Sequence, residues 1–404
     1  MTIAPDVTVQ DAEVFRALEQ TLSASGPRAA LDQLVDHLAE RGEFRALLDA
    51  LLLRARHELE LPLIQVGSLN DLPEPTRAQY EERYVEAIRS VGDRLLKAGD
   101  IASAWPYFRA IGEPEPVRRA IDAYQAVEGD EQINQIVEVA FNQGANPRKG
   151  FELILQHYGT CSAISAFEHL PPDEATRVAC SDRLVRQLHE HLVANLRAEI
   201  AQRGQPMPAE GSLIPALLAG NDWLFLEDAY HIDVSHLSAT ARLAPMLTDP
   251  ETLKLAAGLC EYGRRLSERY QYEGESPFEK TFDDHAVYLA ALLGQDVDLA
   301  LAHFRQKLDS PDPDRPDRSL PAQVLVGLMV RLGRLDQAIE VAAEHLAGLP
   351  ESSLICPGVA QLCQRAGQPD RLAAIARKQG DLVNFTAALL QAAAPKNIPP
   401  SADR

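Results

Sequence analysis

One short spacing recurs along this sequence and constrains the fold more than any other feature. A glycine ends an apolar helical stripe, and after four intervening residues a small or apolar residue opens the next stripe. The spacing occurs in LLKAGDIASAWPYF (95–108), MVRLGRLDQAIEVA (329–342), LCQRAGQPDRLAAIA (362–376) and LAERGEFRALLDALL (38–52), and with one extra residue in LLGQDVDLALAHF (292–304). The glycine lets the chain turn, and the small residue lets the second helix pack closely on the first. One such hairpin cannot bury both faces, so the spacing predicts stacked neighbours.

The composition agrees with a helical chain. Hydrophobic residues make up 46% of the 404 positions but aromatic residues only 6%, so the core is aliphatic. Leu and Ala are strong helix formers, and β-branched runs of strand length are nearly absent. We therefore expect an all-α protein. The segment 171–204, which the loop QPMPAEGS follows, predicts one long helix.

The stretch RLGRLDQAIEVAAEHL (331–346) resembles a tetratricopeptide (TPR) repeat, and the other copies of the spacing resemble it less closely. The aromatic positions and closing proline of the full TPR signature are mostly missing. The resemblance implies a TPR-like α-solenoid of stacked helix hairpins, and it implies no catalytic residues.

The repeat spacing is found toward both ends of the chain, whereas the centre departs from it. We therefore expect N-terminal helical repeats over 1–144, a less regular central helical region over 145–290 and C-terminal TPR-like repeats over 291–394. The polar tail PKNIPPSADR (395–404) has no apolar stripe and is expected to be disordered.

Charge and cysteine usage narrow the expected partners. The formal net charge is −20, and no block of Lys or Arg stands out against it, so we expect no nucleic-acid partner and no membrane binding. Five scattered cysteines without a CxxC pair favour reduced thiols. The first fifteen residues have neither a basic nor an apolar leader region. These observations predict a cytoplasmic protein of unknown oligomeric state.

The stretch YHIDVSHL (230–237) is the most unusual polar cluster. Asp233 or Ser235 there is an ordinary N-cap for the helix that follows, because its side-chain oxygen can accept from a free backbone N–H. Alternatively, His231, Asp233 and His236 could ligate a divalent metal such as zinc or iron if the chain bent near Ile232.

Further polar residues of the central region could join such a site. His285 could be a fourth metal ligand, Glu261 or Asp284 could act as general base, and His157 could be a supporting or acid group. Each also has a structural interpretation, as a helix-end charge, a cap or a surface ion pair. The motifs GxxxxGK[ST], GxGxxG, GxSxG and HExxH are absent.

Two functions follow from these patterns. The first is a non-catalytic scaffold without a cofactor that binds a protein or peptide partner on its concave face. The alternative is a metal-dependent enzyme of hydrolase or isomerase type with its His/Asp/Glu site in the central region. We favour the scaffold, because a fold alone implies no reaction.

Overall fold

A computed structural model describes residues 9–64, 72–127, 129–310 and 319–393 of the chain. These residues form twenty α-helices joined by short turns, and their only β-type pairing is an isolated bridge between Glu273 and Lys280. The prediction of an all-α protein made of stacked helices is confirmed. The predicted tail 395–404 lies outside the described residues.

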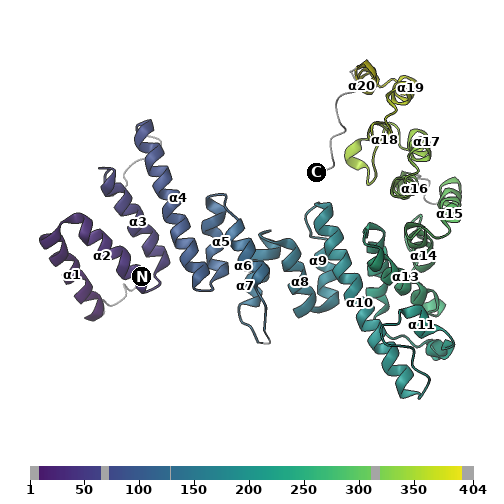
Figure 1. The fold of residues 1–404 in the computed structure, drawn as a ribbon, viewed down its shortest axis with the longest axis horizontal. Coiled ribbons are helices and arrows are strands. Elements are labelled where there is room, and N and C mark those ends of the chain that lie inside the picture. Colours follow the sequence, from purple (N-terminus) through teal and green to yellow (C-terminus); the bar gives the residue numbers. More distant parts are fainter. Residues whose placement is uncertain (1–8, 65–71, 128, 311–318, 394–404) are drawn as a thin grey trace, which may run out of the picture. The chain divides into compact units, whose positions relative to one another are not determined.

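The chain divides into two compact units, Met1–Tyr158 and Gly159–Arg404. In the first unit the helices from α1 to α6 each pack on the next along the chain, and α7 packs on α5 and α8 (Figure 1). Helices α4 and α6 are also in contact. Its helices are α1 (Val9–Ser25), α2 (Pro27–Glu40), α3 (Phe44–Glu58), α4 (Glu74–Lys97), α5 (Ile101–Ala110), α6 (Glu115–Ala123), α7 (Ile133–Val137), the π-helical turn η2 (Glu138–Asn142) and α8 (Pro147–His157).

The second unit begins with a less regular part. It contains α9 (Gly159–Phe167), α10 (Glu174–Gln202), α11 (Ile214–Leu218), α12 (Val234–Leu243) and α13 (Pro250–Arg264), with the 3-10 turns η3 (Asp222–Asp228), η4 (Ala244–Met246) and η5 (Glu268–Tyr270). The long helix predicted over 171–204 is confirmed as α10. It begins where the side chain of Asp173 accepts a hydrogen bond from the Thr176 N–H at 2.8 Å.

The remaining helices of the second unit form a sequential stack in which each helix contacts the next (Figure 1). They are α14 (Thr281–Leu292), α15 (Val297–Asp309), α16 (Ser319–Arg331), α17 (Leu335–His345), α18 (Val359–Arg365), α19 (Pro369–Gln379) and α20 (Leu382–Ala393), with the 3-10 turn η6 (Glu351–Ser353) before α18. Contacts between neighbours are the signature of a helical repeat fold. Assignment to the TPR class specifically stays a prediction.

The glycines of the recurring spacing end their helices as predicted. At Gly333 the backbone has a φ of 71°, the left-handed region that favours glycine. The Gly333 N–H bonds to the Val330 carbonyl at 3.1 Å and the Arg334 N–H to the Met329 carbonyl at 2.8 Å, which satisfies two carbonyls at the helix end. The same pair of bonds follows α2, α4, α14 and α18. Ala338, which follows at the recurring interval, is fully buried.

Three buried hydrophobic clusters form the core. The first extends from Val35 to Leu153, the second from Val185 to Leu289 and the third from Tyr288 to Ala388. The second and third thus meet on α14, close to the boundary expected at 290. The compact units divide after Tyr158, so α8, which the sequence analysis assigned to the central region, belongs to the first unit.

Alternate helices also touch in the second unit. Helix α14 contacts both α12 and α16, skipping α13 and α15 in between. These three helices therefore share one face of the stack, while the intervening helices lie behind them. This arrangement places side chains that are far apart in sequence along one surface.

Glycines inside the helices differ in what surrounds them. A Cβ added at Gly263 of α13 would lie 2.7 Å from Cε1 of Phe282, and this ring is 1% exposed. Gly263 therefore lets α13 and α14 approach closely. Gly327 of α16 is different, because an added Cβ would meet no atom within 4 Å. Helix packing does not require a glycine at that position.

These two positions generate opposite predictions. Gly263→Ala should lower the free energy of unfolding by about 1–3 kcal/mol, because the new methyl group overlaps a buried ring. Gly327→Ala should raise it by about 0.5–1 kcal/mol, because alanine is the better helix former and has room. Chemical denaturation followed by circular dichroism measures both. Equal effects at the two positions would contradict this account of the packing.

Candidate functional site

The YHIDVSHL segment forms the entry to α12. The Asp233 carboxylate accepts hydrogen bonds from the N–H groups of Ser235 at 2.8 Å and His236 at 3.2 Å. The predicted N-cap is therefore confirmed. The hydrogen bond from the Ser235 hydroxyl, with a smaller contribution from these N–H groups, holds the pKa of Asp233 below its usual range. The carboxylate is thus engaged by the first turn of its own helix.

His231 is fixed to the neighbouring helices. Its backbone N–H donates to the Tyr262 hydroxyl at 2.7 Å, and its Nδ1 lies 3.1 Å from the same oxygen. Its carbonyl accepts from Nδ2 of Asn195 on α10 at 2.7 Å. Partial burial lowers the pKa of His231, and burial raises the pKa of Tyr262 to about 12. His231 therefore links α10 to α13 through hydrogen bonds.

The four metal candidates do not gather. Across the described residues no group of three or more His, Cys, Asp or Glu side chains is placed to hold a metal ion. Asp233 caps α12, His231 contacts Tyr262, and His285 donates to a helix carbonyl. His236 is half-buried on α12. The structure thus does not bring His231, Asp233, His236 and His285 together as one set of ligands.

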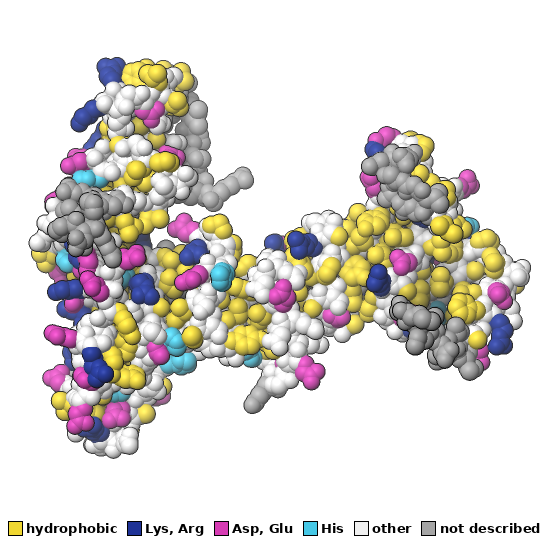
Figure 2. All heavy atoms as spheres, turned by 180° about the vertical axis from the view of Figure 1, so that it is seen from behind, with side chains coloured by type: hydrophobic (Ala, Val, Ile, Leu, Met, Phe, Trp, Pro, Cys, Tyr) yellow, Lys and Arg dark blue, Asp and Glu magenta, His cyan; other side chains and the backbone are white. Residues whose placement is uncertain are grey.

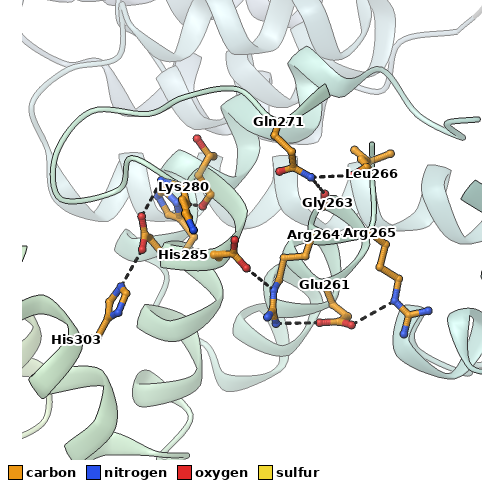
Figure 3. A network of polar contacts seen from close by, with 12 residues as sticks. Glu261, Gly263, Arg264, Arg265, Leu266, Gln271, Lys280, His285 and His303 are labelled. Atoms are coloured by element: carbon orange, nitrogen blue, oxygen red, sulfur yellow. Dashed lines mark hydrogen bonds and ion pairs between the residues drawn. The ribbon is translucent and has the colours of Figure 1, made fainter. Parts of the chain in front are cut away.

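Asp284 is a buried carboxylate that accepts three hydrogen bonds. Its side chain is 2% exposed and accepts from the Lys280 N–H and from Nε2 of His303, each at 2.8 Å (Figure 3). It also accepts from Nζ of Lys307 at 2.8 Å. His303 and Lys307 lie on α15, so these bonds join α14 to α15. With three donors on its two oxygens, Asp284 holds two helices together, and this contact is a structural role.

The two other catalytic candidates also have local roles. Glu261 pairs with Arg264 at 3.3 Å on its own helix and with Arg265, the residue after that helix, at 3.5 Å (Figure 3). His157 is exposed in the last turn of α8 and belongs to the first compact unit, whereas the other candidates belong to the second. Their predicted catalytic roles gain no supporting contact.

A groove in the second unit was not predicted from the sequence. It has a volume of about 820 Å³, within the roughly 300–1,000 Å³ typical of ligand sites. Its walls come from the shared face of α12, α14 and α16, together with η4, the loop 273–278 and Ile355. Arg331 of α16 donates to the carbonyls of Pro245 and Leu247, which ties α16 to the end of η4.

An aromatic stack forms part of this groove. The ring of Phe278 lies nearly parallel to that of His285, with ring centres 4.1 Å apart, and contacts Tyr288 and Phe304 at its edges. The backbone bond from the Gly274 N–H to the Glu279 carbonyl, 2.8 Å, holds the loop that carries Phe278. Burial lowers the pKa of His285 to about 4, so this ring is neutral at pH 7.

Sequence reasoning missed most of the groove residues, among them two on α16. Gln323 and Gly327 line the groove, and they interrupt the otherwise apolar helix SLPAQVLVGLMVR. A polar residue and a glycine four positions apart within an apolar run were the available signal. Such residues share one helix face. Only the three-dimensional arrangement shows that this face is open.

Charge on the surface is mixed. On the face drawn in Figure 2, Lys and Arg side chains are interspersed with Asp and Glu and form no extended basic patch. No helix among the described ranges is long and apolar enough to cross a membrane.

Comparisons with known proteins add little to this geometry. No protein-family description matches the sequence, and no curated protein is similar to it. Among solved structures the chain is similar to a "Circular tandem repeat protein with novel repeat topology and enhanced subunit contact surfaces", at 16% identity over 95% of this chain and 77% of that one, with a TM-score of 0.14. A TM-score of that size carries no argument, so the helical repeat fold rests on the helix contacts described above.

The structural role of Asp284 can be tested against its neighbour. Asp284→Ala should lower the free energy of unfolding by about 3 kcal/mol, because it leaves the mostly buried Lys307 without this partner. Asp283→Ala removes an ion pair to Arg264 whose side chains are about half exposed, and should cost less than about 1 kcal/mol. Chemical denaturation compares the two. Similar losses would show that the buried network does not stabilise α14 on α15.

The burial of His285 predicts a pH dependence. The unfolded chain takes up a proton on this residue near pH 6.5, but the folded chain does so only near pH 4. Stability should therefore fall as the pH drops from 6.5 to 4, by about 3 kcal/mol from this residue, and level off below. Denaturation at several pH values, compared with His285→Gln, isolates this contribution. Parallel curves for the two proteins would contradict it.

Proposed function

We propose that this chain is a helical-repeat scaffold that binds a segment of a partner protein in the groove of α12, α14 and α16. The observation that carries the proposal is the open face of α16. Gly327 lines the groove without any packing contact that requires a glycine, so the helix forgoes about 1 kcal/mol of helix propensity and leaves space there. Space kept open at such a cost is expected of a binding surface.

The groove has the character of a protein-binding site. Apolar side chains line it from several elements, and two of them, Ile355 and Leu320, are 72% and 37% exposed. Exposed large apolar side chains beside a groove gain free energy when a partner covers them. Alternate helices of a stack supply an extended surface, which suits a peptide better than a compact small molecule.

The alternative function, a metal-dependent enzyme, has no comparable support. Among its candidate residues, Asp233 caps α12 and His231 links two helices. Glu261 and Asp284 form ion pairs, and His285 bonds to a carbonyl of its own helix. No observation in the described residues favours it over the scaffold.

The experiment fills the groove from Gly327. Peptides selected from a random 12-residue display library on the wild-type protein are titrated by fluorescence anisotropy against Gly327→Trp and Gly327→Ala. We expect Gly327→Trp to weaken binding at least about tenfold, because the indole occupies the peptide's space, while Gly327→Ala stays within a few-fold of the wild type.

Thermal melting of both variants controls for folding. Selected peptides that bind Gly327→Trp as tightly as wild type would show that the groove is not the binding site. Failure of the library to yield any peptide with a measurable affinity would also contradict the proposal.

A further inference from the structure

Two largely buried polar side chains in the groove each have one nitrogen for which the described residues provide no hydrogen-bond partner. They are His285 of α14, 2% exposed, and Gln323 of α16, 6% exposed. Neither nitrogen is itself a fully buried atom without a partner, so both open onto the groove, where water can reach them. A ligand that displaces this water without replacing its hydrogen bonds loses affinity, so these positions indicate the chemistry of what fills the groove.

The hydrogen-bond partner of Nδ1 determines which ring nitrogen of His285 carries the proton. Nδ1 lies 2.6 Å from the Thr281 carbonyl, and because a carbonyl can only accept, Nδ1 must carry the proton. The neutral ring then has a lone pair on Nε2. No residue in the described part of the chain donates to that nitrogen. His285 therefore offers the groove a hydrogen-bond acceptor.

Gln323 offers the opposite group. Its Oε1 accepts from the Ile355 N–H at 2.7 Å, which assigns the orientation of the amide. Its Nε2 consequently carries two N–H groups, and no acceptor for them exists among the residues that the structure describes. The side chain thus presents a donor, held in place by its bond to the chain before α18.

The main chain of an extended peptide matches this pair. Each residue carries one N–H donor and one carbonyl acceptor, and in an extended strand the N–H and C=O of one residue point to the same side of the chain. The groove also presents apolar surface from Phe278, Tyr288 and Val324. One apolar residue with its flanking peptide groups would meet the acceptor, the donor and the apolar wall together.

The charged residues at the groove favour a ligand with a positive charge. Glu273 and Glu275 line it, are exposed and have no ion-pair partner among the described residues, whereas Arg242 is the single Lys or Arg of the described lining. The whole chain carries −20. A carboxylate or phosphate would meet one arginine but also two acids, beside a neutral ring nitrogen that offers no proton. A Lys or Arg on the ligand is instead attracted to the two glutamates.

We propose that the groove recognises an extended peptide through its main chain, with a peptide N–H donated to Nε2 of His285 and a peptide carbonyl accepting from Nε2 of Gln323. The segment carries an apolar residue against Phe278 and a Lys or Arg toward Glu273 and Glu275. This inference rests on the proposed function and names the ligand class for the same groove.

The test removes single N–H groups from the peptide. A peptide selected on the wild-type protein is made as a series in which each amide in turn is replaced by an ester, which deletes one N–H. We expect one position to lose about tenfold in affinity. His285→Phe keeps a ring for stacking but no acceptor, so the parent peptide and that ester should bind it equally.

His236→Phe serves as the control, since this histidine is on α12 but does not line the groove, and it should retain the sensitivity to the ester. Replacing the peptide's basic residue with norleucine should weaken binding several-fold in the wild type and much less in the Glu273→Gln/Glu275→Gln variant. Circular dichroism and melting confirm that each variant is folded, and the ester series on the wild type alone stands if His285→Phe does not fold.

The outcomes separate this inference from the proposed function. A flat ester series, with binding still blocked by Gly327→Trp, overturns main-chain recognition while the groove remains the binding site. An ester effect that persists in His285→Phe overturns the role of His285. Binding that Gly327→Trp leaves intact overturns the proposed function itself.

Discussion

The structure depends on the inability of a single helix hairpin to bury its own apolar surface. Each turn at a glycine such as Gly333 reverses the chain, and the small residue that follows, Ala338, lets the two helices pack closely. The hairpin still has apolar residues on its outer faces, and stacking on the next hairpin buries them. The continuous third core cluster, from α14 to α20, is the result of repeating this step.

Stacking also creates the binding surface. Because alternate helices touch, α12, α14 and α16 present one continuous face. The groove needs all three helices, since each supplies part of its lining. The bonds from Arg331 to η4 and the loop bond at Gly274 brace two of its walls. The groove is therefore largely formed before a partner arrives, which lowers the entropy that binding must overcome.

Features that depend on neighbouring residues could be predicted from the sequence, whereas contacts between residues far apart in sequence could not. The glycine turns, the long α10 and the cap at Asp233 each depend on residues within a few positions, so pattern and propensity predicted them. The roles of Asp284 and His285 depend on α15 and on the groove. Lys307 lies 23 positions from Asp284, and the groove collects residues from Arg242 to Ile355. A cluster of polar residues in the sequence therefore did not predict the position of the groove.

A crystal structure of the chain bound to a peptide selected on it tests the central claim most directly. The account predicts electron density for an extended segment along α12, α14 and α16, with a main-chain nitrogen within hydrogen-bonding distance of Nε2 of His285 and a carbonyl near Nε2 of Gln323. A peptide seated on another surface would contradict it. So would a groove closed by the loop 273–278 in the complex.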